Sequence, residues 1–389
     1  MDQDTTAKAA AIAIGPRIRK SPFYDATRRY GCKAFTTYNH MYLPVFYESP
    51  EADYRRLIEA VTLWDVGVER QVEITGPDAA RFTQFLTPRN LSTCAVGQCK
   101  YVLLTTERGG IVNDPVLLRL AEDRFWLSLA DSDVLLWARA LAHALGYDVE
   151  VGEPDVSPLQ VQGPRSLELM RDLFGAWIEE LRYFWFRETE LDGIPVVVSR
   201  TGWSAERGYE IFLRDGRHGD RLWEAIMEAG RPYGIGPAAP STIRRIEGGL
   251  LSYGADMDLD TNPYELGLGR LVDLEQEADF LGKAALAEIA RKGVARRLVG
   301  LEIEGPRLPA NEDPWPVAAA GRPLGAPLGT VTSAVHSPRL DKNIALGMLA
   351  VEAGAPGTAV EVTTPSGPRG AAVVELPFFD PKKRLPAQS

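Results

Sequence analysis

Among the residues that could do chemistry, Glu210 stands out because it is a carboxylate within an apolar segment. Residues 209–213 alternate as a strand does, so Tyr209 points to one face while Glu210 points to the other. Burying an unpaired carboxylate costs several kcal/mol. The pattern therefore predicts either a buried acid that meets an array of hydrogen-bond donors, or an edge strand with Glu210 in water.

A second acid, Asp114, lies at the end of a glycine-containing segment. It follows Gly109, Gly110 and Asn113, and Pro115 comes directly after it. Because proline cannot donate to a regular strand ladder, we expect the Asp114 carboxylate at a turn, where it can face a cleft. The alternative is that Asn113 and Asp114 are ordinary turn formers.

Aromatic residues cluster around the segment that carries Glu210. Residues 183–186 are all aromatic, and Trp203 lies in the loop before the strand. A sulfonium or quaternary ammonium ion makes no conventional hydrogen bonds and is held best against aromatic faces. If the substrate is such a cation, Trp203, Trp185 and Tyr209 are the residues expected to contact it, with core packing as the alternative. His40, in the aromatic segment 38–42, is a further candidate, although a structural role is the simpler interpretation.

Composition excludes several classes of function. The 389 residues include 53 acidic and 43 basic ones, a net charge of −10, and no basic block that would bind a nucleic-acid backbone. Four scattered histidines predict no metal site, and three cysteines form no disulfide framework, which favours a reducing cytoplasm. The N-terminal apolar run is too short to span a membrane, and Asp2 and Asp4 precede it where a signal peptide carries positive charge.

The chain length predicts two or three domains. Residues 72–82 and 159–169 repeat one pattern, a short strand followed by Gly-Pro and an amphipathic helix, and so predict two similar α+β lobes. Helices are expected at 222–230 and 243–251. From about residue 293, short strand-like runs separated by Gly/Pro turns predict an all-β domain. The expected parts are a tail (1–30), a first lobe (31–150), a second lobe (151–292) and a C-terminal domain (293–385).

Four segments in order resemble the aminomethyltransferase family, whose best-known member is the T-protein of the glycine cleavage system. These are Gly109-Gly-Ile-Val-Asn-Asp114, the pair Gly202-Trp-Ser204 and Gly208-Tyr-Glu-Ile211, Arg245-Ile-Glu-Gly-Gly-Leu-Leu-Ser-Tyr-Gly254, and Ser337-Pro-Arg-Leu-Asp-Lys-Asn-Ile344. The resemblance implies two intertwined α+β lobes with a C-terminal antiparallel β-barrel, and tetrahydrofolate as the cofactor. It also implies that Asp114 acts on the reacting nitrogen of the folate and that Glu210 binds the pterin.

The same resemblance places Tyr101 beside the folate and Asn113 where the family has another acid. Arg245 matches the arginine of the family's Arg-x-Glu element and is a candidate of the folate site, where we expect structural support rather than direct substrate contact. Two segments depart from the T-protein pattern: Ser241 replaces a folate-contacting arginine, and Asp65-Val-Gly-Val-Glu-Arg70 replaces Asp-Val-Ser-His-Met. Both changes affect the T-protein pocket, so they argue against glycine-cleavage activity.

Within the family, segments such as Val96-Gly-Gln-Cys-Lys-Tyr-Val102 look most like the dimethylsulfoniopropionate demethylases. This likeness predicts transfer of a methyl group from that sulfonium compound to tetrahydrofolate. The alternatives are a methylated amine or aryl methyl ether as methyl donor, glycine-cleavage transfer, and a non-catalytic folate-binding module. The oligomeric state is not predicted by the sequence.

Overall fold

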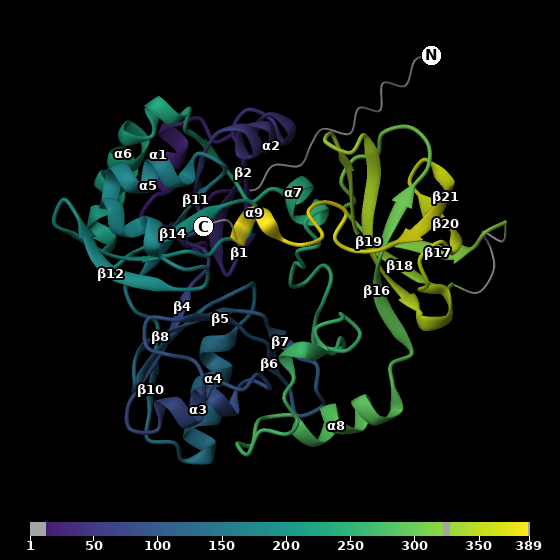
Figure 1. Cartoon of the computed structure of the whole chain (residues 1–389), viewed down its shortest axis with the longest axis horizontal. Coiled ribbons are helices and arrows are strands. Elements are labelled where there is room, and N and C mark those ends of the chain that lie inside the picture. Colours follow the sequence, from purple (N-terminus) through teal and green to yellow (C-terminus); the bar gives the residue numbers. More distant parts are fainter. Residues whose placement is uncertain (1–12, 322–326, 388–389) are drawn as a thin grey trace.

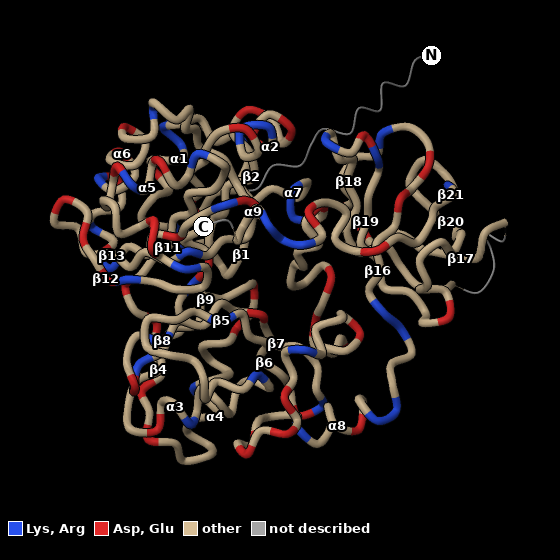
Figure 2. Tube along the Cα trace, viewed as in Figure 1, with Lys and Arg blue, Asp and Glu red and all other residues tan. Residues whose placement is uncertain are grey.

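The computed structural model describes residues 13–321 and 327–387. It contains two α+β lobes and a β-barrel, placed like the corners of a triangle (Figure 1). The predicted fold class is confirmed, including the antiparallel C-terminal barrel. Figure 2 shows acidic and basic residues interspersed over all three parts. Among the helices in the described ranges, none is long and apolar enough to cross a membrane.

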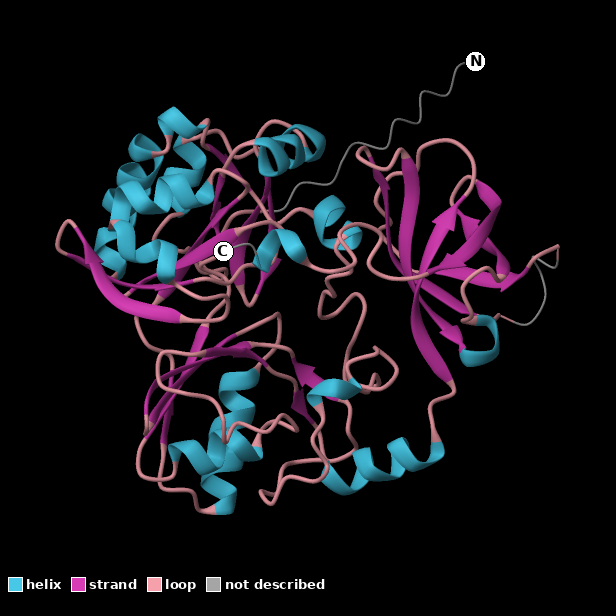
Figure 3. Ribbon diagram, viewed as in Figure 1, coloured by secondary structure: helices cyan, strands magenta, loops and turns pink. Residues whose placement is uncertain are grey.

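The first lobe is built on a five-stranded antiparallel sheet with the order β10-β4-β9-β8-β5. Helices α3 (Ala79–Phe85) and α4 (Val134–Leu145) pack on this sheet through one shared apolar core (Figure 3). A separate pair, β6 (Leu104–Thr105) and β7 (Ile111–Asn113), extends toward the barrel side. The sheet strands are β4 (Gln71–Thr75), β5 (Cys99–Tyr101), β8 (Val116–Ala121), β9 (Arg124–Ser128) and β10 (Glu150–Gly152).

The second lobe has a six-stranded sheet with the order β12-β13-β14-β11-β3-β15. Three helices contribute side chains to the core of this lobe, and α6 contacts the other two. They are α1 (Tyr24–Arg29), α5 (Ser166–Phe174) and α6 (Gly219–Ala229). Its strands are β3 (Thr62–Asp65), β11 (Ser157–Gln162), β12 (Phe186–Leu191), β13 (Ile194–Ser199), β14 (Gly208–Leu213) and β15 (Gly236–Ala238).

Because β3 precedes the first lobe in the chain but lies in the sheet of the second, the two lobes are intertwined. The hairpin of β1 (Ala34–Tyr38) and β2 (Met41–Phe46) and helix α2 (Pro50–Glu59) also precede the first lobe. A boundary at residue 31 therefore does not match the sheets. Residues expected in the N-terminal tail form α1, and Phe23 and Tyr24 are buried there because both are large apolar side chains. Residues 1–12 of the expected tail lie outside the described residues.

The repeated Gly-Pro pattern marks two equivalent turns, from β4 into α3 and from β11 into α5. Gly76 and Gly163 have φ of +124° and +130°, values that side chains of L-residues rarely adopt. A Cβ at Gly163 would lie 2.5 Å from the carbonyl oxygen of Ala60. Glycine at this position lets the chain turn sharply against the segment that leads into β3.

The C-terminal domain is a closed barrel with the order β16-β19-β18-β17-β20-β21. Five of its strands match predicted runs, and β17 is additional. Helix α7 (Thr242–Glu247) connects the second lobe to the barrel, and α8 (Lys283–Lys292) and α9 (Arg384–Ala387) lie outside it. The helix predicted to reach residue 251 ends at Glu247, because Gly248 and Gly249 follow, the latter with φ +62°. The strands are β16 (Arg296–Ile303), β17 (Trp315–Ala319), β18 (Gly329–Ser337), β19 (Lys342–Ala350), β20 (Ala359–Thr364) and β21 (Gly367–Val374).

Candidate active site

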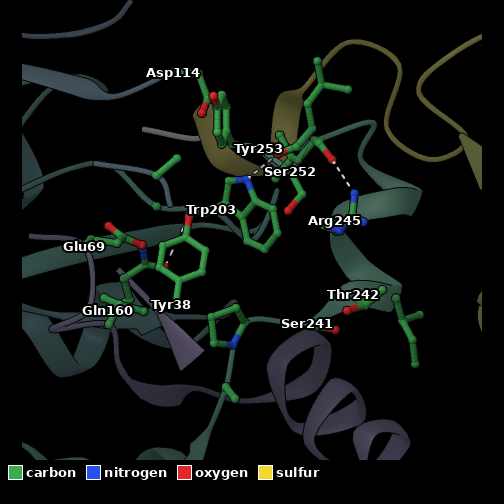
Figure 4. Close-up of a pocket in the computed structure, with 18 of the residues that line it drawn as sticks. Tyr38, Glu69, Asp114, Gln160, Trp203, Ser241, Thr242, Arg245, Ser252 and Tyr253 are labelled. Carbon is green, nitrogen blue, oxygen red and sulfur yellow. Dashed lines mark hydrogen bonds between the residues drawn. The ribbon is translucent and has the colours of Figure 1, made fainter. Parts of the chain in front are cut away.

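A cavity of about 1560 Å³ lies where the three parts meet (Figure 4). The first lobe contributes Asp114, the second Gln160 and Glu210, and the barrel Val335 and His336. Small-molecule sites usually measure roughly 300–1,000 Å³. This cavity therefore has room for a large cofactor together with a second, smaller reactant.

Asp114 lies between β7 and β8, at the turn that Pro115 predicts, and its carboxylate lines the cavity. The Tyr101 hydroxyl, at the end of β5, donates to Asp114 Oδ2 at 3.0 Å. The other oxygen, Oδ1, is buried without a hydrogen-bond partner among the residues described. Burial raises the pKa of Asp114 to about 7. One oxygen is thus held by Tyr101, and the other has no hydrogen-bond partner among the residues described.

Glu210 lies on β14, in the middle of the second-lobe sheet between β13 and β11, and is 3% exposed. Its Oε1 accepts a hydrogen bond from Gln160 Nε2 at 2.8 Å, and its Oε2 accepts one from the Thr201 hydroxyl. Burial raises the pKa of this carboxyl. The edge-strand alternative is therefore wrong, and the expected array of donors is present.

Glu69, on the segment between β3 and β4, is a third acid that lines the cavity. Gln160 Nε2 lies 3.4 Å from its Oε1, so one amide is shared between Glu69 and Glu210. Burial, reinforced by the negative charge of Glu210, raises the pKa of Glu69 well above its usual range. In the sequence this residue stood out only as a departure from the family pattern. The next residue, Arg70, pairs with Glu153 rather than with Glu69. A Glu-Arg pair in the sequence therefore did not indicate that Glu69 lines a cavity.

Trp203 lines the cavity, and its indole Nε1 donates to the Leu251 carbonyl at 3.2 Å. Tyr38 and Tyr253 also line it, and Figure 4 shows Tyr38 beside Glu69 and below Trp203. Sequence reasoning did not select either tyrosine. Their segments lie far from Trp203 in the chain and meet it only in the folded molecule.

Two of the aromatic residues expected at the site are elsewhere. Tyr209 is fully buried in the second-lobe core, on the face of β14 opposite to Glu210, as the alternation of the strand requires. Trp185 is not among the residues that line the cavity. It packs against the same core, and the Arg182 guanidinium stacks on its ring at 3.9 Å from the centroid.

His40 and Asn113 also differ from expectation. His40 is exposed in the turn between β1 and β2, with Nε2 3.1 Å from Asp133 Oδ1. Asn113 is fully buried, and its amide donates to the Ala130 carbonyl and the Ser132 hydroxyl at 3.0 and 2.9 Å. Its side chain fixes the loop beside Asp114 and is not among those that line the cavity.

Arg245, on α7, borders the cavity and also braces the fold. Its guanidinium donates to Asp256 Oδ2 at 2.8 Å and to the Ser333 hydroxyl of the barrel at 2.6 Å. The structural role expected for Arg245 therefore has a specific basis. Ser241 lines the cavity as well and caps α7 by accepting from the Arg244 amide at 3.2 Å.

Comparison with known proteins agrees with this architecture. Residues 23–276 match the model of the GCVT N-terminal domain, and residues 296–380 match that of the glycine cleavage T-protein C-terminal barrel domain. The chain is 44% identical to dimethylsulfoniopropionate demethylase DmdA of Ruegeria pomeroyi, over 94% of this chain and 99% of that protein. It is 32% identical to an aminomethyltransferase of Desulfitobacterium hafniense, over 89% and 93% of the two chains.

Among solved structures, the aminomethyltransferase T of the glycine cleavage system from Bartonella henselae superposes with a TM-score of 0.83 at 25% identity. The match covers 93% of this chain and 98% of that one. The fold and these relationships define a one-carbon transferase that uses tetrahydrofolate. The chain belongs to the glycine cleavage T-protein family.

The cavity fits a reduced folate. The pterin ring of tetrahydrofolate presents adjacent amino and ring N–H groups, and carboxylates are their natural acceptors. Glu210 is a buried acceptor in the wall, and Asp114 Oδ1 is a buried oxygen without a partner among the residues described. The wall of the cavity thus contains carboxylates of the kind that such N–H groups require.

Proposed function

We propose that this protein transfers a methyl group from dimethylsulfoniopropionate to tetrahydrofolate, giving 5-methyltetrahydrofolate and methylmercaptopropionate. The observation that carries the choice of methyl donor is the 44% identity to a dimethylsulfoniopropionate demethylase, against 32% to the aminomethyltransferases. The cavity supports it. Aromatic rings line its wall, and none of the acids Asp114, Glu69 and Glu210 has an ion pair among the described residues, which suits a positively charged donor.

When bound, tetrahydrofolate supplies the nucleophile: the lone pair of N5 forms the new bond to the methyl carbon, the electron pair of the broken C–S bond stays on sulfur as a neutral thioether, and the N5 proton departs. Asp114 is the residue we assign to that proton, because its Oδ1 has no partner among the described residues and its pKa is about 7. Tyr101 holds the opposite oxygen and so fixes the direction of the free one.

Glu210 orients the pterin in this proposal. Gln160 and Thr201 each donate to one of its oxygens, which fixes the carboxylate plane while leaving lone pairs for a ligand. A sulfonium is already an activated leaving group, so neither a covalent nucleophile nor an acid at sulfur is required. Catalysis then rests on alignment of the methyl carbon with N5 and on removal of one proton.

The decisive experiment offers the purified protein tetrahydrofolate with one methyl donor at a time and detects 5-methyltetrahydrofolate. We expect product with dimethylsulfoniopropionate and little with glycine betaine, dimethylglycine or vanillate. Product with vanillate alone would show that the methyl donor is an aryl ether and not a sulfonium. Folate binding without product from any of these donors would refute the proposed donor class and leave the family assignment intact.

The cavity wall provides a matched pair of variants for the same assay. Trp203→Leu removes an aromatic face that lines the cavity, so we expect KM for the sulfonium to rise about three- to thirtyfold, the range of one cation–π contact. Trp185→Leu is the control, because Trp185 is absent from the cavity wall. A larger effect of Trp185→Leu on KM would contradict the placement of the methyl donor beside Trp203.

A further inference from the structure

Glu69 has no part in the steps above, although it lines the same cavity. It lies on the segment between β3 and β4, and its carboxylate faces the space bordered by Tyr38, Gln160 and Trp203 (Figure 4). No Lys, Arg or His forms an ion pair with it within the described ranges. Glu69 is half-buried, and an acid in such a place without a cationic partner is costly to ionise. A positively charged ligand would offset that cost.

Hydrogen bonds tie Glu69 to the other walls of this space. Gln160 Nε2 lies 3.4 Å from Glu69 Oε1, and the backbone N–H of Trp203 lies 3.4 Å from Gln160 Oε1. Burial raises the pKa of the Tyr38 phenol, and the negative charge of Glu69 nearby raises it further. One carboxylate and two aromatic rings thus border a common space, the combination that recognises an onium ion.

We propose that the Glu69 carboxylate, with the rings of Tyr38 and Trp203, holds the positively charged head of the methyl donor and thereby selects a cationic donor over a neutral one. This inference rests on the proposed function, because it requires a donor with a positive charge. Glu210 and Asp114 also face this space, and their nearness to Glu69 adds to the negative potential that the cation would meet. Burial and the negative charge of Glu210 raise the pKa of Glu69, the Ser128 hydroxyl opposes that rise, and a bound cation would favour the ionised carboxylate.

Glu69 could instead accept hydrogen bonds from the pterin, as Glu210 does. Two observations favour the cation. Glu210 shares the Gln160 amide with Glu69 and already offers a pterin acceptor. Glu69 lies beside the Tyr38 ring, whereas Glu210 accepts hydrogen bonds from Gln160 and Thr201. The two assignments predict opposite effects of one substitution.

The test uses Glu69→Gln, which keeps the shape of the side chain and removes its charge. Binding is measured by calorimetry on the full chain in complex with 5-methyltetrahydrofolate, whose N5 has already received its methyl group, so that no turnover occurs. The probes are dimethylsulfoniopropionate and 4-methylpentanoate, in which a neutral CH group replaces the sulfonium sulfur. Glu51→Gln is the control, because Glu51 lines the same cavity but is paired with Arg307 at 2.8 Å.

We expect Glu69→Gln to weaken binding of dimethylsulfoniopropionate by about ten- to a hundredfold in Kd, which is the effect of one nearby charge at an intermediate effective dielectric. Binding of 4-methylpentanoate and of 5-methyltetrahydrofolate should change by less than about threefold. Glu69→Asp, which keeps the charge, should recover part of the affinity for the sulfonium. Unchanged folate affinity shows that each variant is folded.

Equal weakening of both probes by Glu69→Gln would overturn the inference, and so would loss of folate affinity with sulfonium binding intact, which would place Glu69 in the pterin site. If the parent protein itself does not bind dimethylsulfoniopropionate, the proposed function fails. That outcome is distinct from failure of the inference alone, in which the parent binds the sulfonium and the variant binds it equally well.

Discussion

Burial raises the pKa of Asp114 to about 7. No residue of opposite charge pairs with Asp114 among those the structure describes, so nothing offsets this effect of burial by ion pairing. The hydrogen bond from Tyr101 acts in the other direction and keeps the pKa from rising further. An aspartate in water has a pKa near 3.9 and is a weak base. The surroundings of Asp114 therefore raise its pKa, and Asn at this position would keep the shape of the side chain without its charge.

We predict that Asp114→Asn lowers kcat by about 10²–10⁴-fold, the usual contribution of a general acid or base, and binds tetrahydrofolate with little change. The parent kcat, at saturating substrates, should rise with pH and level off above about 7, because only the ionised carboxylate takes a proton. Rapid-quench kinetics from pH 5 to 9 would measure both effects. An unaltered kcat in the variant would exclude Asp114 from proton transfer.

The same substitution carries a prediction about stability. The pKa of Asp114 is raised from 3.8 to about 7 in the folded protein, so the native state binds the proton more tightly than the unfolded chain does. Stability from this residue is therefore present at low pH and is lost as pH rises toward 7. We expect Asp114→Asn to have an equal or higher Tm than the parent at pH 8. A lower Tm there would show that the carboxylate makes a favourable interaction that we have not identified.

Glu210→Gln should weaken the binding of tetrahydrofolate, because an N–H of the pterin loses a charged acceptor. A charge-assisted hydrogen bond contributes roughly 1.5–3 kcal/mol, or about ten- to a hundredfold in Kd. Gln160 and Thr201 can rearrange around the neutral amide, so the fold should persist. Calorimetric titration measures the change, and circular dichroism checks that the variant is folded. Equal affinity in variant and parent would remove Glu210 from the pterin site.

At the residue scale, the sequence predicted those features that depend on neighbours in the chain. Pro115 predicts the turn that carries Asp114, and the alternation of residues 209–213 places Glu210 opposite to Tyr209. The wall of the cavity depends on segments that are far apart. Trp203 lines the cavity where its loop meets the segment after α7, with Nε1 donating to the Leu251 carbonyl, and no local pattern contains that information.

At the scale of elements, the two Gly-Pro turns impose a requirement that a substitution can measure. Gly163→Ala would place a Cβ 2.5 Å from the Ala60 carbonyl oxygen, at a φ of +130°. Gly146→Ala is the control, since Gly146 also has a positive φ, +70°, but its Cβ would meet nothing within 4 Å. We expect the control to lose roughly 1–2 kcal/mol of unfolding free energy and Gly163→Ala to lose more. Urea denaturation would show whether the steric contact adds to the cost.

Elements were predictable where their burial follows a simple period. The strand-Gly-Pro-helix units and five of the barrel strands overlap the predicted runs, although their ends differ. Strand β17 was missed because Pro316 interrupts it, and a proline in a run argues against a strand from sequence alone. The place of β3 in the second sheet was also missed, because sheet partners are set by packing between distant segments rather than by the sequence of one strand.

At the scale of the whole molecule, buried charges join the second lobe to the barrel. Arg245 of α7 and Asp256 of the following loop have side chains that are 7% and 0% exposed. Asp256 Oδ1 also accepts hydrogen bonds from the hydroxyls of Thr332 and Ser333 on β18, at 2.6 and 2.7 Å. Because Arg245 borders the cavity as well, this network fixes one wall of the site relative to the barrel.

Arg245 and Asp256 should therefore be coupled in stability. Either Arg245→Met or Asp256→Asn leaves a buried polar partner unsatisfied, and we expect each to reduce the free energy of unfolding by about 3–5 kcal/mol. The double variant should lose clearly less than the sum, by about 0.5–3 kcal/mol, because the second change removes the group that the first left unpaired. Chemical denaturation of the four proteins gives this coupling energy.

The surface pair Arg29 and Asp220, 3.0 Å apart with side chains 46% and 58% exposed, is the control, and its cycle should give less than about 1 kcal/mol. Additive losses at Arg245 and Asp256 would mean that the two residues stabilise the lobe and the barrel separately, and that the wall of the site does not depend on their contact.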